Sequence, residues 1–193
     1  MATSRQEYLN TLAQRLSRYF DVSWNQEIEG QRFDLVARFK VRNEKYFFVK
    51  SLTLFAYENQ EIVLVGGDRR IDKAEAEGFA QRIKDLIPLL VKPSEEHMST
   101  TLTGVLVGEE GVAAEARTLV EGFRHSRNFK WLLEGWCDVR LLAVDLASGQ
   151  VYSNKAGRAV REAYRVPDGK EGKEGVWPPP REDRIGTIRG FCW

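Results

Sequence analysis

The spacing of hydrophobic residues near the start of the chain changes from three or four residues to two, which predicts a helix followed by strands. Ser4 and Glu7 form a capping box, and helical spacing continues to Phe20, where we expect the helix to end. From residue 21, hydrophobic and polar residues alternate, which predicts a strand that closes at Gly30. The hydrophobic positions of the helix are Tyr8, Leu9, Leu12, Leu16, Tyr19 and Phe20.

Three more strands and a second helix are predicted in the first half of the chain. The strands are "RFDLVARFKV", "KYFFVKSLTLFAY" and "EIVLV", and their order predicts an antiparallel meander. Helical spacing returns from about Asp72. We expect Pro88 to kink or end this helix, because proline lacks an N–H donor and its ring clashes with the preceding turn.

The second half of the chain is predicted to form a strand, a helix and a strand. "TLTGVLV" and "WCDVRLLAVDL" are the strands, with helical spacing over about 112–125 between them. Such a unit forms a right-handed parallel crossover if both strands join one sheet. A turn at "ASGQ", a short strand "VYSN" and a short helix "AGRAVREAY" follow. The predicted fold class is α+β: an N-terminal helix, an antiparallel meander, a helix and a βαβ-like unit.

We expect one domain over residues 1–165 and a tail over residues 166–193. Glycine, proline and charged residues are frequent in the tail, which argues against regular structure there. Trp177, Phe191 and Trp193 also lie in it, so we expect it to dock on the domain or on a second copy in a homodimer.

Composition narrows the classes of function. The 193 residues include 29 basic and 28 acidic side chains, a net charge of +1, so a nucleic-acid partner would need a local basic patch and no membrane partner is expected. The chain has no N-terminal signal segment and no run of eighteen apolar residues, so we expect a cytoplasmic protein of bacterial type. Two cysteines and two histidines without metal-site spacing indicate no cofactor.

The strand "WCDVRLLAVDL" carries a cysteine and three charged residues. Its apolar surroundings predict a core position for Cys137 rather than a nucleophile paired with His125. Asp138, Arg140 and Asp145 are interpreted as charges at a sheet edge or in a second layer.

Two carboxylates are predicted to meet in the first hairpin. If Gly30 and Gln31 form its two-residue turn, Glu27 lies directly opposite Asp34. Facing carboxylates repel unless a cation or a proton compensates, which makes this pair a candidate site.

The register of the following strand decides whether Lys50 joins the carboxylates. A two-residue turn at Asn43 and Glu44 places Lys50 opposite Ala37 on the core face, whereas a shift by one residue brings it to Asp34 and Glu27. Burial of an unpaired ammonium costs several kcal/mol, roughly, so the shifted register is favoured.

The element order over about residues 4–107 resembles the core of the restriction-endonuclease-like, or PD-(D/E)XK, nucleases. That superfamily carries an aspartate on its second core strand and an acid-x-lysine triplet on its third. Asp34 and Lys50 match, but Phe48 stands where the acid of the triplet belongs. The resemblance implies Mg²⁺ bound by Asp34 and Glu27, with Lys50 positioning or deprotonating a water. The chain also resembles a group of uncharacterised bacterial proteins, which implies no activity.

Basic residues suggest phosphate contacts at two places. Arg38 and Lys40 lie near the second hairpin, and Arg69 and Arg70 lie in "VGGDRR" between a strand and a helix. This loop lacks the spacing of the known phosphate-binding motifs, yet its amides could bind a small anion. Three hypotheses stay open: a non-enzymatic binding or interaction domain, which we favour, a nuclease-like protein, and a binder of a small anionic ligand.

Overall fold

The computed structural model describes residues 3–39, 58–91, 97–128 and 136–167. The helices in these ranges are α1 (Arg5–Leu16), α2 (Lys73–Leu90) and α3 (Ala114–Gly122), with a 3-10 helix, η2, over Arg158–Tyr164. The strands are β1 (Phe20–Ile28), β2 (Gln31–Phe39), β3 (Glu58–Gly66), β4 (His97–Gly108), β5 (Ser126–Asn128), β6 (Trp136–Asp145) and β7 (Gln150–Ser153). The α+β fold class is confirmed.

All of these strands join one mixed sheet in the order β1-β2-β3-β4-β6-β5, and β7 pairs with β6. β1, β2 and β3 are antiparallel neighbours, whereas β3, β4 and β6 run parallel. The predicted parallel pairing of the two later strands is therefore confirmed. The antiparallel pairing of the first two strands is also confirmed, but the predicted place of "EIVLV" as the fourth strand of the meander is wrong, because β3 pairs directly with β2. The third strand of the described meander is β3, and the predicted strand "KYFFVKSLTLFAY" lies outside the described residues.

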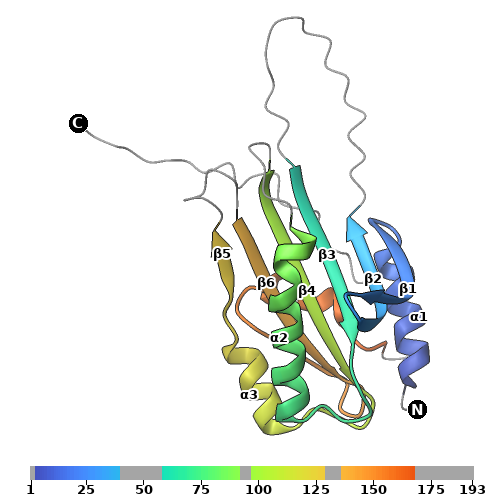
Figure 1. Ribbon diagram of the computed structural model, residues 1–193. Helices are drawn as coiled ribbons and strands as arrows, with labels where there is room; N and C mark the ends of the chain where they lie inside the picture. The colour runs from blue at the N-terminus through green and yellow to red at the C-terminus, as the bar shows by residue number, and fades with distance from the viewer. Residues whose placement is uncertain (1–2, 40–57, 92–96, 129–135, 168–193) are drawn as a thin grey trace, which may run out of the picture.

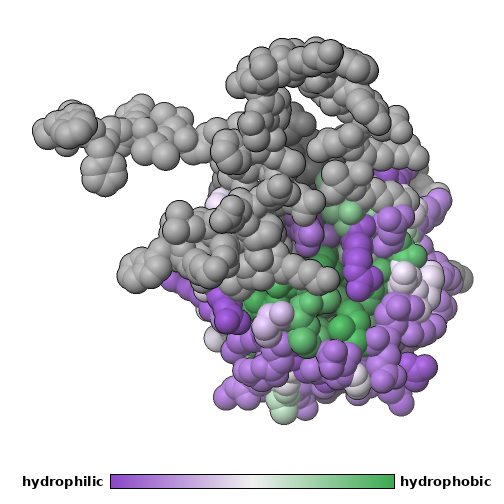
Figure 2. Space-filling view, turned by 45° about the horizontal axis from the view of Figure 1, so that its top comes forward, coloured by the Kyte–Doolittle hydropathy of each residue, from purple (hydrophilic) through white to green (hydrophobic). Residues whose placement is uncertain are grey.

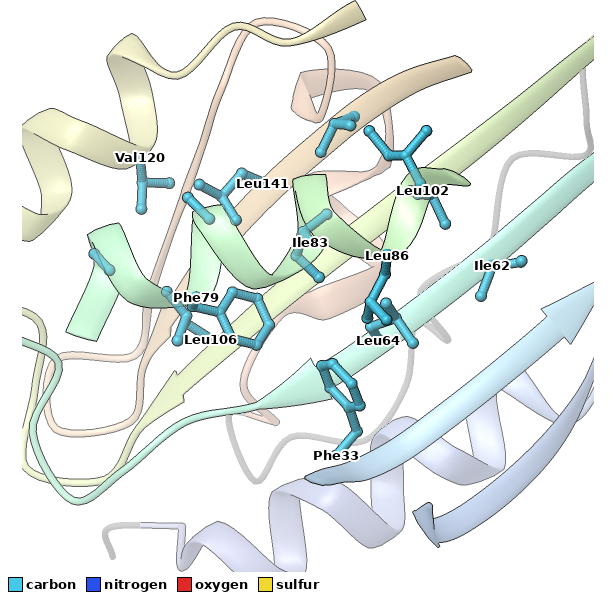
Figure 3. Close-up of a cluster of buried hydrophobic side chains, with 14 of the residues drawn as sticks. Phe33, Ile62, Leu64, Phe79, Ile83, Leu86, Leu102, Leu106, Val120 and Leu141 are labelled. Atoms are coloured by element: carbon cyan, nitrogen blue, oxygen red, sulfur yellow. The ribbon is translucent and has the colours of Figure 1, made fainter. Parts of the chain in front are cut away.

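Helices cover both faces of the sheet (Figure 1). α2 and α3 pack on one face, where Phe79, Ile83 and Leu86 of α2 point toward Leu64, Leu102 and Leu106 of the strands (Figure 3). α1 and η2 pack on the other face, which we call the α1 face; Tyr8 and Tyr164 are fully buried there. Because parallel strands are buried on both faces, β3, β4 and β6 read as nearly continuous hydrophobic runs.

Two helix ends differ from expectation. The capping box at Ser4 and Glu7 is present, but α1 ends at Leu16, since Phe20 begins β1 and is buried in the core. α2 begins after Asp72, whose side chain caps the amide of Glu75, and it continues past Pro88 to Leu90. Of the two effects predicted for Pro88, a kink or an end, the end of the helix is wrong, because Pro88 lies in the last turn of α2 and its missing N–H removes one hydrogen bond there.

The surface seen in Figure 2 is largely hydrophilic, with a hydrophobic patch among the described residues. Exposed large hydrophobic side chains include Tyr19, Trp24 and Leu89. Single exposed hydrophobic residues of this kind are normal on folded proteins. Within the described ranges, none of the helices combines the length and hydrophobicity that a membrane span requires.

Glycine at position 104 allows α2 to lie close against β4. A Cβ atom on Gly104 would lie 3.0 Å from the Ile83 Cγ1 and Phe79 Cε1 atoms. We expect Gly104→Ala to lower the free energy of unfolding by about 1–3 kcal/mol, because the added methyl group overpacks this contact. Urea unfolding measures the change.

Gly78 provides the matched control, because it lies in α2 and a Cβ atom there meets nothing within 4 Å. Gly78→Ala is expected to raise stability by about 0.5–1 kcal/mol through helix propensity alone. Equal effects of the two substitutions would contradict the proposed close packing of α2 on β4.

Candidate functional site

The first hairpin differs from the predicted register by two residues. Its turn residues are Glu29 and Gly30, with φ angles of 50° and 73°, as a type I′ turn requires. Ile28 pairs with Gln31, and Glu27 pairs with Arg32 rather than with Asp34. The predicted turn at Gly30 and Gln31, and the facing of Glu27 and Asp34, are therefore wrong. The physical reason is that glycine takes the second left-handed position of the turn, not the first.

Asp34 is engaged by an arginine from α1. Arg5 Nη2 lies 2.6 Å from Asp34 Oδ2, and Nη1 lies 3.5 Å from Oδ1. Nη2 also donates to the Gly67 carbonyl at 3.0 Å. This ion pair joins the start of α1 to β2 and to the loop after β3.

The surroundings of Asp34 do not fit the Mg²⁺ site that the nuclease resemblance implies. Both carboxylate oxygens of Asp34 accept from Arg5, and Glu27 is displaced along β1. In the part of the chain that the structure describes, no group of three or more His, Cys, Asp or Glu residues is placed to hold a metal ion.

Lys50 and Lys40 lie outside the described residues. Both registers considered for Lys50 placed its strand beside β2, but over Leu35–Arg38 that place is taken by β3. Ala37, for example, lies between Val22 and Val63, so the pairing of Lys50 with Ala37 is wrong.

The predicted phosphate-binding residues do not form one patch. Arg38 is exposed on β2 and pairs with Ile62, in the middle of β3. Arg69 and Arg70 are exposed in the loop after Gly66, beyond the carboxyl end of β3. The second half of β3 therefore lies between Arg38 and the loop that carries Arg69 and Arg70.

The "GGDRR" loop uses several of its backbone groups internally. The Arg69 amide donates to Asp68 Oδ1 at 2.7 Å, and the Ile71 amide donates to the Gly111 carbonyl at 3.1 Å. A Cβ atom on Gly67 would lie 2.5 Å from the Val107 carbonyl oxygen, so this glycine serves the packing of the loop on β4. These contacts leave the loop fixed against its neighbours rather than arranged around an anion.

A different polar group lies on the α1 face of the sheet. Because β3, β4 and β6 are in register, their side chains form rows across this face. The row through Val105 is hydrophobic, but the next two rows toward the amino ends of the strands contain polar residues. We call these two the polar rows; they contain Glu61, Thr101 and Asp138, and then Val63, Thr103 and Arg140.

An ion pair across β4 connects the polar rows. Arg140 Nη1 lies 2.5 Å from Glu61 Oε1, and the two side chains are 22% and 12% exposed. Thr103, which is fully buried between them on β4, has a hydroxyl with no hydrogen-bond partner in the described structure. Of the two interpretations of Arg140, as an edge charge or as a second-layer charge, the edge is wrong, since β6 lies inside the sheet between β4 and the pair β5 and β7.

Burial dominates the electrostatics of this region. It raises the pKa of Glu61, and the positive charge of Arg140 opposes that shift. Burial also raises the pKa of Tyr164 well above its usual range, and the negative charge of Glu61 adds to that effect. The pKa of Cys137 is raised to about 12, first by burial and then by Asp138, which agrees with the predicted core position.

The sequence contained a signal for the polar rows. Glu61 begins the apolar run "EIVLV", and Arg140 interrupts "DVRLLAV". A charged residue inside a strand that is buried on both faces requires a partner. The identity of that partner could not be predicted, because the two residues are 79 positions apart.

Residues 4–166 match the family described as Domain of unknown function (DUF8052). The chain belongs to this family. The match spans Glu61, Thr103 and Arg140, so the polar rows are part of the DUF8052 domain. No curated protein and no solved structure matches the chain.

Removal of one partner of the Glu61–Arg140 ion pair is expected to lower the free energy of unfolding more than removal of both partners. Arg140→Met should lower the free energy of unfolding by about 3–5 kcal/mol at pH 7, because it leaves the Glu61 carboxylate buried without a cation. Glu61→Gln combined with Arg140→Met should lose less than the sum of the single changes. Urea unfolding of the wild type, the two single variants and the double variant gives the coupling free energy between Glu61 and Arg140. Arg5→Met and Asp34→Asn form the comparison pair, in which the arginine is similarly exposed but the carboxylate is 29% rather than 12% exposed, and a coupling of about 1 kcal/mol or less is expected there.

The raised pKa of Glu61 also predicts a pH dependence. Its folded-state pKa lies above the usual value of 4.5, so between the two pKa values the folded state binds more protons than the unfolded state. The contribution of Glu61 to stability is therefore greatest below 4.5 and is lost as pH rises through the folded-state pKa. Urea midpoints from acidic to neutral pH should show this fall in the wild type relative to Glu61→Gln. If the difference between the urea midpoints of the two proteins does not change with pH, the predicted pH dependence is contradicted.

Proposed function

We propose that this DUF8052 domain binds a small oxyanion, a carboxylate or a phosphate, at Arg140 on the α1 face. The observation that carries the proposal is the Glu61–Arg140 ion pair, in which the arginine is held in position while its side chain remains 22% exposed. Among the described residues, the bond to Glu61 uses one of the five N–H donors of Arg140, which leaves the other donors for a ligand.

The position of Arg140 favours the recognition of an anion. A planar guanidinium binds carboxylate and phosphate groups in a bidentate manner, and one that is already held loses less rotamer entropy on binding. Partial burial lowers the local dielectric and strengthens the attraction. Thr103 is the neighbour of Arg140 on β4, and its buried hydroxyl has no hydrogen-bond partner among the described residues.

Arg5 is a useful contrast, because its ion pair has a similar exposure of 23% for the arginine and 29% for the aspartate. Arg5, however, donates hydrogen bonds to both oxygens of Asp34 and to the Gly67 carbonyl. We therefore assign a structural role to Arg5 and a ligand-binding role to Arg140.

Thermal unfolding and calorimetry with sodium phosphate and with malonate test the proposal, with sodium chloride at equal ionic strength as the reference. Wild-type protein should be stabilised, by about 2.7 kcal/mol at a ligand concentration one hundred times the dissociation constant. Glu61→Gln combined with Arg140→Gln should lose this effect while leaving no charge buried alone.

Two further variants test whether binding depends on the guanidinium of Arg140. Arg140→Lys should weaken binding about tenfold or more, since lysine keeps the charge but not the bidentate donors. Arg5→Gln should keep the ligand-induced stabilisation, although its starting stability is lower. Equal stabilisation of the wild type and the Glu61→Gln, Arg140→Gln variant would overturn the assignment of the site.

A second candidate function is the nuclease-like activity that the sequence resemblance implies. The described order of α1, antiparallel β1 to β3, α2 and a parallel β4 supports it. The pairing of Asp34 with Arg5, and the Phe48 in place of the acid of the triplet, depart from the superfamily pattern.

Incubation of the protein with plasmid and single-stranded DNA in Mg²⁺ or Mn²⁺ tests this candidate. Nicking by the wild type that is lost in both Lys50→Ala and Asp34→Ala is the result expected of a nuclease. Nicking that persists in both variants, or that is absent from all three proteins, removes the candidate.

A further inference from the structure

We propose that the oxyanion site at Arg140 takes an α-amino acid, whose carboxylate binds Arg140 and whose ammonium group binds the carboxylates of Glu61 and Asp138. The ligand class rests on the proposed function, since it concerns the same site. Its support comes from the balance of charge in the polar rows and from a buried hydroxyl group that has no hydrogen-bond partner in the described structure.

The polar rows place two carboxylates around one cation. Glu61, Thr101 and Asp138 lie in one row, and Arg140 follows Asp138 by two residues on the same face of β6. From the spacing of residues and strands in a sheet, the Asp138 Cα lies about 7 Å from that of Arg140 and about 10 Å from that of Glu61. Glu61 neutralises Arg140, so the charge of Asp138 is an excess negative charge beside the site.

Asp138 has no cation of its own. Its side chain is half-buried, and among the described residues it forms neither a hydrogen bond nor an ion pair. Arg124, just before β5, and Lys155, just after β7, are exposed, and in the described structure neither is paired with Glu61 or Asp138. A simple anion at Arg140 would therefore be repelled by Asp138, because like charges interact strongly in a partly buried site. An ammonium group on the ligand removes this repulsion.

The ion pair matches the spacing of the charges in an α-amino acid. Arg140 Nη1 lies 2.5 Å from Glu61 Oε1, so an anion-binding group and a cation-binding group adjoin. In an α-amino acid the carboxylate and the ammonium group are attached to the same carbon atom and are likewise adjacent. Such a ligand can use the remaining donors of Arg140 and the second oxygen of Glu61 while the ion pair stays intact.

The hydroxyl of Thr103 is an independent sign of a ligand. Thr103 is fully buried on β4 between Glu61 and Arg140, and its Oγ1 atom has no hydrogen-bond partner in the described structure. A buried polar group that lacks a partner destabilises a fold, and a bound molecule can supply the missing hydrogen bond. A carboxylate oxygen that Arg140 holds beside β4 can accept from this hydroxyl.

Isothermal titration calorimetry of the full chain with L-alanine, propionate and ethylamine tests the ligand class. The three probes share a small apolar body, but propionate lacks the ammonium group and ethylamine lacks the carboxylate. L-Alanine should bind about tenfold or more tightly than either of the other two, because only L-alanine satisfies both signs of charge in the polar rows.

Asp138→Asn should have opposite effects on two of the probes, which a purely structural role of Asp138 would not produce. It should weaken the binding of L-alanine and strengthen that of propionate, by about three- to tenfold each, because the lost charge attracts an ammonium group and repels an anion. Glu115→Gln is the matched control. Glu115 is exposed on α3, on the other side of the sheet, so its replacement should change neither affinity.

Thr103→Val tests the buried hydroxyl separately. This variant should bind L-alanine about two- to tenfold more weakly, as expected for the loss of one hydrogen bond. The urea midpoint of the ligand-free variant should not fall, because valine has a similar shape and removes a polar group that has no partner.

The outcomes separate the ligand class from the proposed function. Equal binding of L-alanine and propionate by the wild type would overturn the ligand class and leave the oxyanion site standing. Unchanged L-alanine binding in Asp138→Asn would also overturn the ligand class. If L-alanine, propionate and phosphate all fail to bind the wild type, the ligand class and the proposed function are both overturned.

Discussion

The parallel pairing of β3, β4 and β6 is the constraint on which the rest of the structure depends. These strands carry helices on both faces, so most of their described side chains are buried. Hydrophobic residues occupy most of these positions. The polar rows are the exception, and they exist because Glu61 and Arg140 neutralise each other across β4.

The carboxyl ends of the parallel strands are closed by contacts between loops. Ile71, after β3, bridges to Val112, after β4, and Asp145 at the end of β6 accepts from the amides of Val112 and Ser148. Open α/β sheets usually bind ligands at this end. In this protein the backbone groups there serve the fold, and the polar side chains lie toward the amino ends instead.

Two arginine–carboxylate pairs, whose arginines are similarly exposed, serve different purposes. Arg5 reaches from α1 to Asp34 and to a backbone carbonyl with three hydrogen bonds, so it fixes one helix to the sheet. Arg140 lies within the sheet and, among the described residues, makes one hydrogen bond, to Glu61. The difference lies in the number of donors that the surrounding fold consumes, which neither residue type nor burial alone reveals.

The sequence by itself determined the elements whose signals are local. The capping box of α1, the return of helical spacing near Asp72 and the core position of Cys137 depend on residues near one another in the chain. Only the tertiary structure decided which strand neighbours β2, the two-residue shift of the first hairpin, and the partner of Arg140. The reason is physical: periodicity and capping arise from neighbours within a few residues, whereas register and ion pairing depend on which distant segments the packed sheet brings together.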